Sequence, residues 1–222
     1  MSELSVDVGA DSVSATYDAP EGDQHSLFVA AHGAGGNMND RGMLAVTNAL
    51  KRVGVGVVRF NFLYTEKKSG RPDPMPKLME CVRAVVERAR SVAGAAPLLI
   101  GGRSMGGRVA SMLAATGFDA DGLLLLAYPL HPAGAPEKLR DAHLPDITMP
   151  VLCLNGTRDA LCRRDLMEDA LRRVRTRWTM HWLEGADHSF HVLKSSGRTD
   201  AEVLDDIAVA TQRWCAGLAG RG

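Results

Sequence analysis

Apolar residues along this 222-residue chain occur in two patterns. Short, continuous apolar runs of about four to eight residues are typical of buried strands, whereas apolar residues spaced three or four apart are typical of helices with one buried face. The first pattern predicts strands at residues 27–31, 55–62, 97–100, 122–128, 151–155 and 178–183, and an alternating segment predicts an edge strand at 12–18. The second pattern predicts helices at residues 40–53, 78–92, 109–114, 163–174 and 201–218.

Strands and helices therefore alternate along nearly the whole chain. This order is typical of an α/β fold, in which a mostly parallel, twisted sheet carries helices on both faces. No repeat, linker or low-complexity tract interrupts it, and we expect residues 1–222 to form a single domain. Active sites of such sheets lie at the carboxyl ends of the strands, so the loops that follow the strands are the segments to inspect.

Ser104 lies in one of these loops, within Gly102-Arg103-Ser104-Met105-Gly106. A serine hydroxyl is a poor nucleophile unless a sharp strand-to-helix turn exposes it to a base, and that turn requires small residues two positions before and after the serine. Gly102 and Gly106 meet this requirement, which predicts Ser104 as a nucleophile. A glycine-rich phosphate loop or a plain tight turn is the alternative interpretation.

Two further loops supply an acid and a base. Asp159 follows the strand at 151–155, although an isolated Asp in such a loop is more often a turn former. His188 follows the next strand and completes the chain order Ser, Asp, His that serine hydrolases of this architecture use. His191 is the rival base. Asp187 is a weaker candidate for the acid, because adjacent side chains point apart.

The segment 32–36, His-Gly-Ala-Gly-Gly, follows the strand at 27–31. A tetrahedral intermediate needs two fixed N–H donors for its oxyanion. We expect Met105, next to the nucleophile, to supply one and Ala34 the other, with Gly35 as the neighbouring alternative and as a residue that lines the substrate site. His32 is expected to hold the loop by hydrogen bonds. The alternative is an ordinary glycine-rich turn.

The bulk composition restricts the partners and cofactors. Lys plus Arg and Asp plus Glu both number 26, so there is no electrostatic reason to expect nucleic acid or an anionic membrane as partner. The four cysteines form no CxxC pair and no zinc-like cluster, so we expect no bound metal and no cofactor. We also expect the protein to be located in the reducing environment of the cytoplasm. The start of the chain does not resemble a signal peptide, and no apolar run is long enough for a membrane span. A monomer or homodimer is expected.

Together these segments resemble the α/β-hydrolase superfamily, and within it the dienelactone-hydrolase-like branch. The resemblance is greatest to the subgroup related to a testis-expressed protein and to a subunit of a nonspecific-lethal chromatin complex. The segments Tyr-Pro-Leu-His-Pro at 128–132 and Pro-Glu-Lys-Leu-Arg at 136–140 also resemble this subgroup. It implies an α/β-hydrolase fold from about residue 27 to the last helix, and it implies the triad Ser104, Asp159 and His188. The chromatin relative implies a scaffold role for some members.

Two departures from related hydrolases affect the expected substrate. Only residues 129–150 separate the strands that would flank a cap, so we expect a shallow, open site with a minimal cap or none. Dienelactone hydrolase itself uses a cysteine, and the serine at position 104 means that ring-opening of a dienelactone does not carry over. Arg103 and Arg108 flank the nucleophile, and either would favour a carboxylate-bearing substrate if it reached the cleft, although ion pairs are the more ordinary role.

The expected function is that of a serine hydrolase that cleaves small ester or thioester substrates through an acyl-enzyme on Ser104. The alternative is a catalytically weak or inactive hydrolase fold that serves as a scaffold or binding module. Retention of all three triad residues and of the glycine-rich loop favours the enzyme. Peptidase activity ranks last among the enzymatic interpretations, because no propeller or cap domain is present to select peptides.

Overall fold

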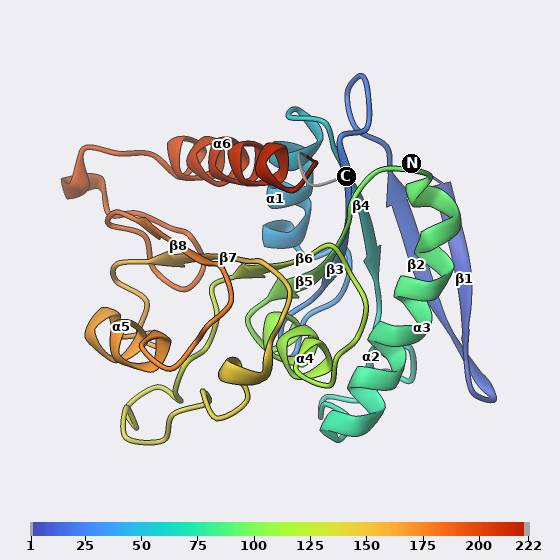
Figure 1. Ribbon diagram of the computed structural model, residues 1–222, viewed down its shortest axis with the longest axis horizontal. Helices are drawn as coiled ribbons and strands as arrows, with labels where there is room; N and C mark the ends of the chain where they lie inside the picture. Colours follow the sequence, from blue (N-terminus) through green and yellow to red (C-terminus); the bar gives the residue numbers. More distant parts are fainter. Residues whose placement is uncertain (1, 220–222) are drawn as a thin grey trace.

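The computed structural model describes residues 2–219, and an eight-stranded sheet forms its centre (Figure 1). The strands are β1 (Ser2–Val8), β2 (Asp11–Asp18), β3 (Ser26–Ala31), β4 (Val55–Phe60), β5 (Leu98–Arg103), β6 (Gly122–Leu126), β7 (Val151–Gly156) and β8 (Trp178–Leu183). The helices are α1 (Arg41–Lys51), α2 (Leu63–Glu66), α3 (Met75–Ala93), α4 (Met105–Ala114), α5 (Arg164–Leu171) and α6 (Asp200–Ala219), with 3₁₀ turns η1 (Leu144–Asp146) and η2 (Lys194–Ser196).

The strand order is β1-β2-β4-β3-β5-β6-β7-β8, and every neighbouring pair from β4 to β8 is parallel. β1 and β2 form an antiparallel hairpin that extends the sheet beyond β4. The sequence analysis overlooked β1, and its placement of the strand at 12–18 at the sheet edge is therefore wrong. β1 turns into β2 through Gly9, whose φ of 63° lies in the left-handed region that glycine adopts without steric cost.

The helices form a layer on each face of the sheet, as Figure 1 shows: α1 and α6 lie above it in this view and α4 and α5 lie below, while α3, at the right, packs into the same core cluster as α4. Each strand feeds both layers, because successive side chains point to opposite faces. In β3, Phe28 packs in the core between the sheet and helices α1 and α6, whereas Val29 packs in the core between the sheet and helices α3 and α4. This explains why nearly every residue of the central strands β3 to β7 is buried, and the predicted α/β class is confirmed.

The connection from β6 to β7 contains no cap, only the short turn η1. Hydrogen bonds hold the first half of this connection in place: the hydroxyl of Tyr128 donates to the carbonyl of Arg140 (2.6 Å), and the amide of Arg163, beyond β7, donates to Nε2 of His131 (3.1 Å). The expectation of a minimal cap is confirmed.

Some local boundaries differ from the predicted ones. α2 was not predicted from the sequence, and α5 ends three residues earlier than expected, at Leu171. Asp40 precedes α1 as expected, but its carboxylate does not cap the helix. It accepts instead from the amide of Asn37 (2.9 Å), because the side chain turns back toward the glycine-rich loop.

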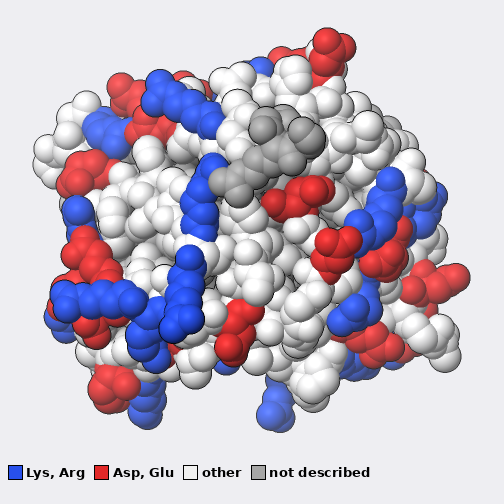
Figure 2. Space-filling model, viewed as in Figure 1, with Lys and Arg blue, Asp and Glu red and all other residues white. Residues whose placement is uncertain are grey.

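The surface charge follows the balanced composition. Over the face drawn in Figure 2, Lys and Arg side chains are interspersed with Asp and Glu side chains, so charges of opposite sign offset one another at short range. Within residues 2–219, none of the helices is both long and apolar enough for a membrane crossing.

Candidate active site

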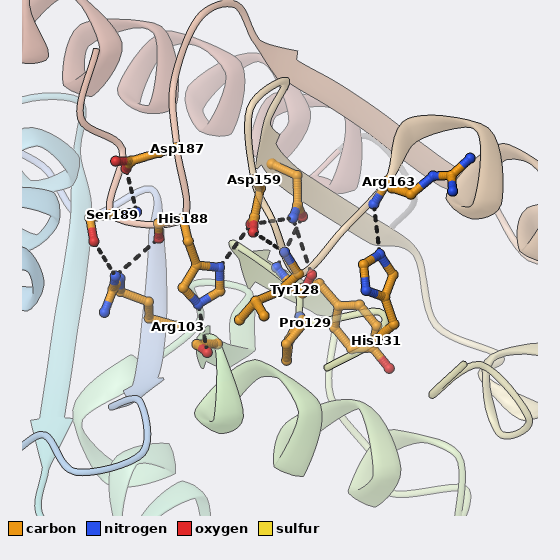
Figure 3. A network of polar contacts seen from close by, with 12 residues as sticks. Arg103, Tyr128, Pro129, His131, Asp159, Arg163, Asp187, His188 and Ser189 are labelled. Carbon is orange, nitrogen blue, oxygen red and sulfur yellow. Dashed lines mark hydrogen bonds and ion pairs between the residues drawn. The ribbon is translucent and has the colours of Figure 1, made fainter. Parts of the chain in front are cut away.

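The loops that carry the predicted site residues meet at the carboxyl ends of β3, β5, β7 and β8. Ala31 pairs with Gly102 across β3 and β5, so the glycine-rich loop and the turn at Ser104 leave the sheet side by side. β6 and β7 continue the sheet in the same direction. The close-up in Figure 3 shows the result: side chains from segments far apart in the sequence point toward one another above this edge.

Ser104 occupies the sharp turn between β5 and α4. Its φ of 51° and ψ of −117° lie in a region that non-glycine residues rarely adopt, and such strain is held in place only by the surrounding structure. Its amide donates to the carbonyl of Leu126 (2.9 Å), and its carbonyl accepts from the amide of Arg108 (3.0 Å). A Cβ atom on Gly106 would lie 2.2 Å from the carbonyl oxygen of Ala31, so only glycine lets α4 start this close to β3.

His188 joins the serine to the acid. Its Nε2 lies 2.9 Å from Oγ of Ser104, and its Nδ1 lies 2.8 Å from Oδ2 of Asp159. An ionised carboxylate only accepts, so Nδ1–H donates to Asp159 and Nε2 is left to accept from the serine hydroxyl. The side chain of Asp159 is fully buried, whereas that of His188 is 24% exposed and open to a substrate.

Asn155 fixes the orientation of the buried acid. Its Nδ2 donates to Oδ2 of Asp159 (3.2 Å), while Oδ1 of Asp159 accepts from the amide of Leu161 (2.8 Å). Asn155 is itself held by both backbone groups of Tyr128, at 3.0 and 3.1 Å. The sequence analysis missed this residue. A polar side chain at the end of a buried strand must find partners, and that requirement was the available signal.

The loop around His188 accounts for the two rival residues. Oδ1 of Asp187 accepts from the amides of Ser189 (2.7 Å) and His191 (3.1 Å), so this carboxylate stabilises the loop and is not bonded to the imidazole of His188. The ring of His191 pairs with Asp200, with Nδ1 2.9 Å from Oδ2. Neither rival joins the hydrogen-bonded chain that contains Ser104.

The glycine-rich loop forms a tight turn beside Ser104. The amide of Gly36 donates to the carbonyl of Gly33 (3.2 Å), and Gly35 has a φ of 70°, which favours glycine at this position of the turn. Within residues 2–219, the amides of Ala34 and Met105 donate to no protein acceptor. Among the described residues, the amide of Gly35 donates to no protein acceptor either, so the geometry leaves both residues of the turn available as the second donor.

His32 holds this turn from below. It is completely buried, and its Nδ1 lies 2.8 Å from the carbonyl of Gly33 while its Nε2 accepts from the amide of Phe62 (3.3 Å). Nδ1 must therefore carry the proton. Burial lowers the pKa of His32, which keeps the ring neutral in that tautomer. The ring thus turns the Gly33 carbonyl toward itself.

Neither arginine beside the nucleophile forms an ion pair with the described residues, contrary to the more ordinary role considered from the sequence. Nη2 of Arg103 donates to the carbonyl of His188 (3.0 Å) and to the hydroxyl of Ser189 (3.4 Å). Burial lowers the pKa of Arg103, and nearby carboxylates, Asp40 foremost, oppose that change. Nε of Arg108 is buried without a partner.

A cleft of about 710 Å³ opens beside Arg103. Its lining is mixed: Val46, Phe190 and Leu204 are apolar, and the charged side chains include Asp40, Arg41 and Asp200. In the part of the chain that the structure describes, no group of three His, Cys, Asp or Glu side chains is arranged to hold a metal ion.

The fold has counterparts among known proteins. A serine hydrolase homologue from Coxiella burnetii superposes with a TM-score of 0.76 at 19% identity, covering 94% of this chain and 96% of its own. An α/β serine hydrolase without lid from Xanthomonas campestris gives 0.74 at 24% identity, with coverage of 96% and 94%. A dienelactone hydrolase from Anabaena variabilis gives 0.71 at 19% identity, with coverage of 96% and 95%.

The sequence itself matches a family over most of its length. Residues 24–216 match the family described as "Alpha/beta hydrolase domain", a span that contains β3 to β8 and all the candidate site residues. The narrower resemblance to the testis-expressed subgroup stays a prediction. The chain belongs to the α/β-hydrolase domain family.

Proposed function

We propose that the protein is a serine hydrolase that cleaves small ester or thioester substrates through an acyl-enzyme on Ser104. The observation that carries the proposal is the continuous hydrogen-bonded chain from Ser104 through His188 to the buried Asp159, ending on a serine held at positive φ. A strained nucleophile, a base within hydrogen-bond distance and an acid that orients the base are the parts that acyl transfer requires.

The three residues act in turn in the reaction. Oγ of Ser104 attacks the carbonyl carbon while Nε2 of His188 takes the hydroxyl proton, and Asp159 stabilises the resulting imidazolium. The tetrahedral intermediate collapses when His188 gives that proton to the leaving alcohol or thiol. His188 then removes a proton from water, the hydroxide attacks the acyl carbon, and Ser104 leaves with its proton restored.

The oxyanion of both intermediates lies between the amides of Ala34 and Met105. These N–H groups come from the glycine-rich turn and the start of α4, which the missing side chain at Gly106 allows to approach. Gly33 and Gly35 leave space for the substrate: a Cβ on Gly33 would lie 3.6 Å from Cβ of Ser104. One lost oxyanion donor costs roughly a hundred- to a thousandfold in kcat in comparable enzymes.

The short β6–β7 connection and the exposed edge of His188 support a small substrate. Without a cap, the walls near Ser104 can shield only a few methylene groups from water. Each buried methylene contributes about 0.8 kcal/mol, so long chains gain little binding free energy in an open site.

Labelling with a fluorophosphonate probe tests the proposal. We expect one adduct per chain, on Ser104, located by mass spectrometry of the digested protein. The adduct should be absent in Ser104→Ala and should form far more slowly in His188→Ala, while Ser91→Ala, which removes an exposed hydroxyl on α3, is a matched control.

A screen of p-nitrophenyl esters and acyl thioesters against wild-type and Ser104→Ala protein gives the second readout. Hydrolysis by the wild type alone supports the enzyme. A folded wild-type protein that neither forms the adduct nor turns over any substrate, under conditions that label a control esterase, would instead favour the scaffold interpretation.

A further inference from the structure

We propose that Arg103 is a positioning residue, which acts on the candidate base His188 by holding the backbone of its loop against the nucleophile strand. The catalytic consequence rests on the proposed function. The structural part does not, because it concerns how one loop is attached to the sheet.

The loop at residues 187–191 takes its shape from bonds within itself. The amide of Asp187 donates to the carbonyl of His191 (2.9 Å), the amide of Phe190 donates to the carbonyl of Asp187 (3.0 Å), and Phe190 has a φ of 64°. Outside the loop, His191 pairs with Asp200 of α6, Phe190 is buried in the core, and His188 contacts Asp159, but none of these contacts attaches the loop to the strand that carries Ser104. The loop follows β8, the last strand of the sheet, so no further strand supports it on that side.

Arg103 connects this loop to β5. Within residues 2–219, the hydrogen bonds between 187–191 and β5 or Ser104 are the two made by Nη2 of Arg103 and the one between His188 and the Ser104 hydroxyl. The last of these must break and reform in every catalytic cycle. The arginine contacts to the His188 carbonyl and the Ser189 hydroxyl are therefore the ones that stay in place while the proton moves (Figure 3).

The surroundings of the guanidinium suit this role. Arg103 is the last residue of β5, where its backbone pairs with Leu126 of β6, so the base of the side chain is rigid. On the other side, a Cβ on Gly33 would lie 3.7 Å from Nη1, which places the guanidinium against the glycine-rich turn. One side chain thus lies between the turn that supplies the Ala34 amide and the loop that carries His188.

Loss of this contact should change turnover and leave substrate binding largely intact. A displacement of about 1 Å in a reacting group costs roughly a hundredfold in rate. We expect Arg103→Ala to lower kcat for a neutral ester about ten- to a hundredfold with KM changed less than about threefold, and to slow phosphonylation of Ser104 by a similar factor.

The decisive experiment is chemical rescue. Guanidinium ion, added to Arg103→Ala at a concentration well below the denaturing range, should occupy the vacated space and raise both kcat and the phosphonylation rate, while leaving wild type unaffected. Arg90→Ala is the matched control: Nη2 of Arg90 also donates to a backbone carbonyl, that of Asp119 (2.7 Å), far from the site. Its rates should match wild type with and without guanidinium.

Hydrogen exchange supplies a readout that does not depend on activity. The amides of Asp187, Ser189 and Phe190 should exchange at least several-fold faster in Arg103→Ala than in wild type or Arg90→Ala. If wild type shows no phosphonate adduct but the loop still loosens, the proposed function fails while the positioning role stands.

Two results would overturn the inference. One is unchanged exchange at residues 187–191 in a folded Arg103→Ala protein. The other is a raised KM that is confined to carboxylate-bearing esters, with kcat unchanged and no rescue by guanidinium, which would make Arg103 a substrate contact.

Discussion

Gly106→Ala tests the closeness of α4 to β3, on which the candidate oxyanion hole depends. A Cβ at position 106 would lie 2.2 Å from the carbonyl oxygen and 2.5 Å from the carbonyl carbon of Ala31, and 2.7 Å from the carbonyl oxygen of His32. These are backbone atoms of a central strand and cannot rotate away. Since non-bonded atoms of this kind come no closer than about 3.5 Å without repulsion, α4 must move by about 1 Å.

That displacement should affect stability and turnover together. Overpacking of this size costs about 1–3 kcal/mol, and 1 kcal/mol shifts Tm by about 2–4 °C in a protein of this length, so we expect Tm to fall by about 3–10 °C. The same movement carries the Met105 amide away from the turn at Ala34. A misplacement of about 1 Å is expected to lower kcat/KM roughly a hundredfold.

Thermal unfolding and steady-state hydrolysis of a short p-nitrophenyl ester measure the two effects. Gly70→Ala is the control, because a Cβ there would meet no heavy atom within 4 Å, and its Tm should be unchanged or slightly higher. The reasoning is refuted if Gly106→Ala keeps both the Tm and the kcat/KM of wild type.

Three further predictions concern the acid, the substrate and the pH dependence of stability. Asp159→Asn should keep the fold and lower kcat by about three to four orders of magnitude, whereas Asp187→Asn should do much less; the reverse order in a kinetic comparison would mean that the wrong carboxylate was chosen. Across p-nitrophenyl esters, kcat/KM should peak at about two to six acyl carbons, and a steady rise to twelve or more would contradict an open site. Burial lowers the pKa of His32 below its usual 6.5, so as the pH falls this histidine takes up its proton more readily in the unfolded chain than in the folded protein. The contribution of His32 is therefore complete above about pH 6.5 and is lost below it, by at most about 1.4 kcal/mol per pH unit. Urea unfolding at several pH values should show a flatter acidic slope for His32→Gln, and an equal slope would exclude this role.

Periodicity predicted the interior of the fold well, because the central strands and the packed faces of the helices obey a single requirement, burial. It failed at the margins. β1 was missed although Leu4, Val6 and Val8 alternate with polar residues, the same pattern that predicted the strand at 12–18. Of its residues Val6 and Val8 are buried, and the strand is held by its pairing with β2. α2 has four residues, which is too short for a helical period to appear.

The candidate site divides in a similar way. Ser104, Asp159 and His188 could be proposed from local motifs, because strain and loop position leave a mark on the neighbouring residues, above all on Gly102 and Gly106. For the supporting residues, the sequence shows at most a polar side chain in a buried strand and not the partner that it binds. Asn155 contacts the backbone of Tyr128, and Arg103 contacts the backbone of the histidine loop, 85 positions away in the sequence. Nearly every residue carries a backbone carbonyl and amide, so the sequence alone cannot show which residue such a side chain contacts.

The positive φ at Ser104 has a consequence for the evolution of this chain. A non-glycine residue in that conformation costs on the order of 1–3 kcal/mol, which is a considerable share of the roughly 5–15 kcal/mol that stabilises a typical domain. Selection for folding alone would favour glycine at position 104, and Ser104→Gly should accordingly unfold at a higher temperature than the wild type. A protein that keeps serine at this position is less stable than its glycine variant, and the serine that it keeps presents its hydroxyl to a substrate.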